Sequence, residues 1–314
     1  MIRIAVSLAL AYSILPGQGG RANQAAPLPA PFTVAVNTTT IEAAPVYVAD
    51  HGPSGVDFEV ANGGVRNLAN GTAHAATNAE TQMLILGDPK VRLLMTVAEG
   101  LYRVVAKRSA GIRSVADLRG KRITVPRDTS AHYYLVRTLA RAGIGESEVA
   151  LVDLPRNQMA AGVVSGQADA ISMWEPEAQK AVDALGGDAV VFQDTRLYRE
   201  LFSLYTTTDV LSDPRRHQQL VTFVRALIAA TDVLNSTPQP HFAVIARTIE
   251  QAVERVVTSW PHHRFPAALP ADLLDVMVEE EQWVARNQRR TAHGRAELAR
   301  LIDASVLAEA RGDR

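Results

Sequence analysis

Along this chain, short continuous runs of apolar residues alternate with segments in which apolar residues recur at helical spacing. This alternation predicts an α/β fold. Short apolar runs end in polar turns, and after the turns apolar residues recur at helical spacing, as at Ala131, Leu135 and Leu139. Strands that alternate with helices favour parallel sheets, whose ligands lie at the carboxyl ends of the strands. The runs that we predict as such strands include Phe32 to Val36, Ala73 to Thr77, Arg122 to Val125, Val149 to Val152 and Ala168 to Met173.

The stretch from Arg122 to Tyr134 shows the pattern most completely. Its strand stops at Pro126, and Thr129 or Ser130 then stands at the N-cap position of a helix. The first N–H groups of a helix have no partner inside it, and the helix dipole adds partial positive charge there. This helix tip is suited to bind an anion or a carbonyl oxygen, although the two hydroxyls could simply cap their own helix.

The strand–turn–helix plan occurs twice along the chain. Gly71 to Ala75 and Gly166 to Ala170 occupy equivalent places, each after a helix and before a strand. Such repetition predicts two lobes with one plan. We place lobe 1 at residues 27–112 and 203–314, including C-terminal helices, and lobe 2 at residues 113–202.

Four polar turns are expected to meet in a cleft between the lobes, because each follows the carboxyl end of a predicted strand. They are Asn37 to Thr40, Thr77 to Glu80, Arg127 to Ser130 and Trp174 to Pro176. The strands Tyr102 to Ala106 and Ser203 to Thr207 are expected as the two crossings between the lobes.

The charges of the side chains nearly cancel. Thirty-two lysine and arginine residues against 33 aspartate and glutamate residues give a formal net charge of −1, and only 5% of the residues are aromatic. The chain therefore has neither the basic footprint nor the stacking platforms of nucleic-acid-binding proteins. It has no cysteine, which excludes disulfides, thiolate nucleophiles and thiolate zinc sites.

No sequence pattern indicates a catalytic centre, a metal or a cofactor. His262 and His263 are adjacent and point different ways, with no carboxylate at ligand spacing. Asp128, Ser130 and His132 lie too close together on one helix start to form a catalytic relay. The sequence also lacks a phosphate-binding glycine-rich loop and a dinucleotide fingerprint. We therefore expect a binding protein without a metal or a cofactor.

Residues 1–26 match the pattern of a secretory signal peptide. Arg3 precedes an apolar run from Ile4 to Leu15, and Pro16 and Gly17 end that run. We expect cleavage near residues 22–26 and a mature protein in the periplasm. The alternative is a plain buried N-terminal segment.

Several segments carry a resemblance to a known family. They are Ala43 to Gly52, Asp117 to Arg122 leading into Thr129 and Ser130, Gly166 to Ala170 followed by Trp174-Glu175-Pro176, and Ser212-Asp213-Pro214. In order and spacing they resemble the solute-binding proteins of ABC importers for nitrate, aliphatic sulfonates and taurine, a family that also includes binders of thiamine-pyrimidine precursors. The resemblance implies a bilobed type II periplasmic-binding-protein fold, with two α/β lobes joined by two crossing strands and with C-terminal helices.

The resemblance also implies a function. A monomeric periplasmic protein of this family captures a small sulfonate-like, nitrate-like or heteroaromatic solute between its lobes and delivers it to an ABC permease in the inner membrane. The alternatives are a ligand-sensing module for a membrane receptor and a pyrimidine-precursor-synthesising enzyme. The ligand contacts that the resemblance implies are Thr38, Thr39, Thr40, Asn78, Thr129, Ser130, Trp174 and Glu175.

Two of these residues also have a structural interpretation. Trp174 could stack on a ligand or pack under the hinge, since aromatic residues serve both pockets and cores. Glu175 could instead favour the start of the helix that follows it, because an acidic side chain there complements the helix dipole.

Overall fold

The computed structural model describes residues 31–51 and 57–313. The predicted signal peptide, residues 1–26, and its cleavage site lie outside these residues. From Pro31 onward the chain forms one compact unit that contains two β-sheets.

The two sheets share one plan, in which the first strand of a lobe lies between its second and third strands. In the six-stranded sheet β1 pairs in parallel with β2 and β3, and β10 then pairs antiparallel with β3 and β4. In sheet order its strands are β11 (His263–Arg264), β4 (Val91–Gly100), β10 (Glu200–Thr207), β3 (Ala75–Asn78), β1 (Phe32–Val36) and β2 (Phe58–Asn62).

The five-stranded sheet repeats this order. Strand β6 pairs in parallel with β7 and β8, and β5 pairs antiparallel with β8 and β9. In sheet order its strands are β7 (Ala150–Val152), β6 (Arg122–Thr124), β8 (Ala170–Met173), β5 (Arg103–Lys107) and β9 (Ala189–Phe192). The repeat expected from the sequence, two lobes with one plan, is thus confirmed at the level of strand order.

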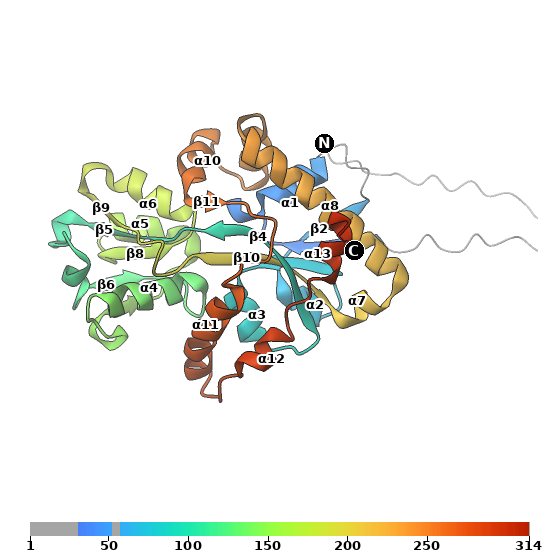
Figure 1. Ribbon diagram of the computed structural model, residues 1–314. Helices are drawn as coiled ribbons and strands as arrows, with labels where there is room; N and C mark the ends of the chain where they lie inside the picture. Colours follow the sequence, from blue (N-terminus) through green and yellow to red (C-terminus); the bar gives the residue numbers. More distant parts are fainter. Residues whose placement is uncertain (1–30, 52–56, 314) are drawn as a thin grey trace, which may run out of the picture. The chain divides into compact units, whose positions relative to one another are not determined.

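Helices cover both faces of each sheet (Figure 1). Side chains alternate along β1, so Val34 packs into one core with Phe223, and Ala35 packs into another with Met277. The first core lies under α1 (Ala44–His51), α8 (Pro214–Ser236), α9 (Phe242–Thr248) and α13 (Ser305–Arg311), and the second lies under α2 (Val65–Ala69), α3 (Glu80–Leu86), α11 (Leu273–Asn287) and α12 (Arg295–Ala299). Around the five-stranded sheet, α4 (Ser130–Arg141) covers one face and α5 (Met159–Val164) and α6 (Glu177–Leu185) cover the other.

The chain passes between the sheets twice. It leaves β4 through Leu101 and Tyr102 to enter β5, and it leaves β9 through residues 193–199 to enter β10. Strand β5 therefore belongs to the five-stranded sheet, although we expected residues 103–112 in lobe 1. We propose to set that lobe boundary at Gly100, where β4 ends and the backbone changes sheet.

The remaining helices include α7 (Thr208–Ser212) and α10 (Val253–Ser259). Among the residues from 31 to 313 that are described, no single helix is long and apolar enough to cross a membrane. The bent pair Pro214–Ser236 and Gln239–Thr248, which turns by 115°, passes that test by length and composition alone. Nine residues of α8, including Phe223, are buried.

Candidate functional site

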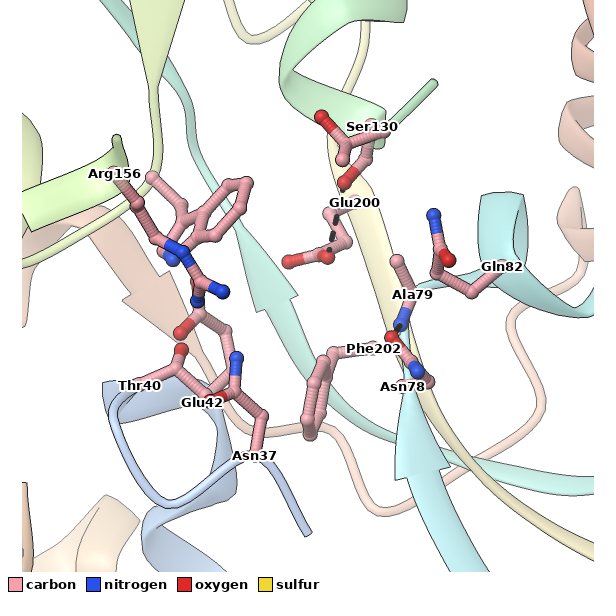
Figure 2. A pocket seen from close by; sticks show the side chains of 12 residues that line it. Asn37, Thr40, Glu42, Asn78, Ala79, Gln82, Ser130, Arg156, Glu200 and Phe202 are labelled. Carbon is pink, nitrogen blue, oxygen red and sulfur yellow. Dashed lines mark hydrogen bonds between the residues drawn. The ribbon is translucent and has the colours of Figure 1, made fainter. Parts of the chain in front are cut away.

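A cavity of about 190 Å³ lies where the ends of both sheets meet. This volume suits a solute smaller than a typical drug molecule. Figure 2 shows the cavity from close by. Its lining residues are Asn37, Thr40, Glu42, Asn78, Ala79, Gln82, Thr129, Ser130, Arg156, Trp174, Glu200 and Phe202.

The local structure explains why these elements supply polar groups. Asn37 and Thr40 follow β1, Asn78 ends β3, and Thr129 and Ser130 open α4. In an α/β sheet the carboxyl ends of parallel strands and the first turns of the following helices meet at one edge, so their unpaired N–H groups and polar side chains gather there. Lobe 1 and lobe 2 both contribute such ends.

Five of the eight contacts expected from the sequence line the cavity. These are Thr40, Asn78, Thr129, Ser130 and Trp174. Thr39 lines an adjacent hollow that shares Asn37, Asn78 and Arg156 with this cavity. The cavity thus contains at least one residue from each of the four turns that we expected to converge.

The other two expected contacts have partners of their own. The Thr38 hydroxyl donates to Asn62 Oδ1 at 3.2 Å. Glu175 is buried beside Arg103 and accepts hydrogen bonds from the Gln179 N–H at 3.0 Å and the Ser259 hydroxyl at 3.2 Å. Neither of them lines the cavity, and Trp174, the neighbour of Glu175, does.

The start of α4 lies at the cavity as expected, but its capping differs from the one that the sequence suggested. Thr129 is the N-cap residue, but its hydroxyl donates to the Pro126 carbonyl at 2.6 Å and caps no N–H group of the helix. The Ser130 hydroxyl lies 2.8 Å from the Tyr102 hydroxyl and donates to Glu200 Oε1 at 3.3 Å. The tip of α4 therefore lies at the cavity without a side-chain cap from Thr129.

Two buried carboxyl groups are the main polar feature that the sequence did not place. Glu42, in the 3-10 turn Ile41–Ala43, is 1% exposed, and Glu200, the first residue of β10, is 4% exposed. Burial, together with the nearby charge of Glu42, raises the pKa of Glu200 well above its usual range. Glu42 was not among the ligand contacts expected from the sequence, and no local pattern marks Glu200, Phe202 or Gln82.

Trp174 combines the two roles that the sequence left open. Its ring is half-buried at the cavity wall and lies 6.3 Å from the Tyr102 ring, which belongs to the crossing from β4 to β5. The exposed Arg156 guanidinium lies 5.6 Å from the centre of the indole ring on the cavity side. The indole therefore both packs beside the crossing and offers surface to a ligand.

Two further polar residues named in the sequence analysis, Arg127 and His263, do not line the cavity. Arg127 pairs with Asp153 at 2.7 Å on an exposed loop and does not line this cavity. His263 is buried, with its Nε2 atom 3.6 Å from Glu42 Oε1. Within residues 31–51 and 57–313, the histidine, aspartate and glutamate side chains form no group of three or more that could hold a metal ion.

The protein has two sheets with the same strand order, two chain crossings between them and a polar cavity at the ends of their strands. These features define the class of proteins with the periplasmic-binding-protein fold. Solved structures agree with this class. The alkanesulfonate-binding protein SsuA from Xanthomonas axonopodis pv. citri matches with a TM-score of 0.69 and 18% identity, over 87% of this chain and 98% of that one. The desulfurization enzyme DSZB shares the fold as well, with a TM-score of 0.62 and 15% identity, over 89% of this chain and 99% of that enzyme.

The chain belongs to the NMT1/THI5 like family, whose family model matches residues 54–240, more than half of the chain. A putative aliphatic sulfonates-binding protein of Escherichia coli is 23% identical over 57% of this chain, and the taurine-binding periplasmic protein of the same bacterium is 30% identical over 42%. The matched segments span 55% of the first relative and 40% of the second. The family expected from the sequence is thereby confirmed, and so is the fold.

Proposed function

We propose that this protein is the periplasmic substrate-binding component of an ABC importer and that its ligand is a small sulfonate-like or heteroaromatic solute. The observation that carries the proposal is the polar cavity lined from both lobes, because a ligand that contacts both lobes stabilises their closed arrangement. The sulfonate-binding and taurine-binding relatives support this class of solute. The solute then passes to a permease, and the protein itself carries out no reaction.

Thermal unfolding of the mature protein tests the proposal. Nitrate, taurine, alkanesulfonates and aminopyrimidines are added in turn, and a true ligand is expected to stabilise the folded state by about 2.7 kcal/mol at a hundredfold excess over its Kd. A panel without any stabilising member would count against a substrate-binding role. Stimulation of ATP hydrolysis by the cognate permease separates transport from the alternative of a sensing module.

A second experiment tests whether ligands bind in this cavity. Trp174→Ala is expected to weaken binding of any stabilising solute by about tenfold or more, because the indole forms one wall of the cavity. Trp260→Ala is the matched control, since Trp260 packs against Phe242 and Phe265 in lobe 1 and does not line the cavity. If titration calorimetry gives the two variants equal affinities for the ligand, the ligand binds outside this cavity.

A further inference from the structure

The cavity contains carboxyl oxygens that the protein itself leaves without hydrogen-bond donors. Glu42 Oε2 and Glu200 Oε2 are both buried and have no hydrogen-bond partner among the described residues. Both side chains line the cavity, and Figure 2 shows the Glu200 carboxyl group extending into it. Since buried polar atoms in folded proteins are nearly always paired, these two oxygens indicate a missing donor.

A glycine keeps the space between these two carboxyl groups open. A Cβ atom at Gly100, the last residue of β4, would lie 2.7 Å from Glu200 Oε2 and 3.3 Å from Glu42 Oε1. Any side chain at this position would therefore displace at least one of the two glutamates. The pair thus faces a shared space that the backbone leaves free.

Few basic side chains lie near the pair. Among the residues that line the cavity, Arg156 is the one lysine or arginine, and it is exposed and lies over the Trp174 ring. The nearest described histidine atom, His263 Nε2, is 3.6 Å from Glu42 Oε1 and has no hydrogen-bond partner among the described residues. A simple oxyanion such as nitrate would bring a further negative charge to this side of the cavity.

We propose that the ligand carries a cationic N–H group, such as a primary ammonium, an amidinium or a protonated amino-heterocycle, which lies between Glu42 and Glu200 and donates hydrogen bonds to both. This inference rests on the proposed function and narrows its substrate class. Among sulfonates it selects aminosulfonates over alkanesulfonates, because the ammonium group supplies the missing donors. The sulfonate end then faces Arg156 and the start of α4, which provides unpaired N–H groups.

Capture of such a ligand is coupled to a proton. In the empty cavity burial favours the neutral form of Glu200, and an adjacent cation favours the ionised form. Binding therefore releases a proton, and affinity rises with pH over the range in which Glu200 titrates. The titratable groups that interact with Glu200 are Glu42, Glu80, Tyr102, Tyr198, Tyr205 and Glu280. Ser130 donates a hydrogen bond to Glu200, and His263 lies beside Glu42.

Matched pairs of probes test the inference by titration calorimetry. Taurine is compared with isethionate, which replaces the ammonium group by a hydroxyl, and benzamidine is compared with benzamide. The cationic member of at least one pair is expected to bind about tenfold tighter, and its binding heat is expected to vary with the ionisation enthalpy of the buffer because a proton is released. Glu42→Gln and Glu200→Gln are each expected to reduce this preference about tenfold.

The control is Glu99→Gln. It removes the same charge one residue before Gly100, from a carboxylate that pairs with Arg199 at 2.8 Å and does not line the cavity. This variant is expected to keep the preference for the cationic probe. If Glu200→Gln does not fold, Glu42→Gln and the proton release of the unaltered protein decide the question.

Three results would overturn the inference: no tighter binding of the cationic member in either pair, no cationic probe binding at millimolar concentration, or an unchanged preference in both glutamine variants. The proposed function can survive each of them. If isethionate or another anion binds in the cavity and stimulates the permease, the protein is a substrate-binding component and only the cationic ligand class is wrong. If no solute of either panel binds, the proposed function itself fails.

Discussion

Replacing Glu175 with alanine is expected to lower the free energy of unfolding by about 3–5 kcal/mol, because the substitution leaves a buried guanidinium without its carboxylate. The side chains of Arg103 and Glu175 are 6% and 3% exposed, and Arg103 Nε donates to Glu175 Oε1 at 2.7 Å. Burial raises the pKa of Glu175, and the charge of Arg103 opposes that shift. The carboxylate joins β5 and α6 of lobe 2 to Ser259 of lobe 1.

Urea unfolding of single and double variants measures this effect. Asp275→Ala is the control, since Asp275 and its partner Arg295 have side chains that are 60% and 58% exposed, and its loss is expected to cost less than about 1 kcal/mol. Combining Glu175→Ala with Arg103→Ala should cost less than the sum of the two single losses, because the double variant contains no unpaired charge. Additive losses would show that the two side chains contribute independently.

The sequence predicted the parts of the site that local structure determines. Thr40 and Trp174 follow strands and Asn78 ends one, and strand–turn–helix patterns are short enough to read from neighbouring residues. Thr129 and Ser130 were found because helix N-caps have a recognisable composition. The alternation of strands and helices predicted the α/β class and the two lobes with one plan, but it did not specify the order of the strands in either sheet.

Residues that the sequence did not place depend on contacts between distant parts of the chain. Glu200 and Phe202 reach the cavity because β10 enters the six-stranded sheet between β3 and β4, after the whole of lobe 2. Nothing in residues 198–204 specifies that pairing, so no local pattern could show which of their side chains face a ligand. Glu175 was expected to contact the ligand but does not line the cavity, because its carboxylate binds Arg103, which lies on a strand 72 residues earlier in the chain.

Replacing Glu80 with glutamine is expected to change how stability depends on pH. Glu80 is fully buried, accepts hydrogen bonds from the Tyr198 hydroxyl at 2.8 Å and the Leu201 N–H at 2.9 Å, and lies beside the buried Glu280 of α11. Burial raises the pKa of Glu80 from 4.5 to about 7. Between these two values the unfolded chain loses the proton while the folded protein keeps it, so the folded state loses stability as the pH rises.

Comparing Glu80→Gln with the unaltered protein at each pH isolates the contribution of Glu80 to the pH dependence of stability. Relative to the unaltered protein, Glu80→Gln is expected to gain on the order of 3 kcal/mol in unfolding free energy between pH 4.5 and pH 7, since glutamine releases no proton. The comparison is needed because burial lowers the pKa of His262 to about 4, and that group acts in the opposite direction over the same range. Glu59→Gln, which makes the same substitution at an exposed position of β2, is the matched control. A constant difference between Glu80→Gln and the unaltered protein across this range would mean that Glu80 is ionised throughout and that its charge is compensated inside the fold.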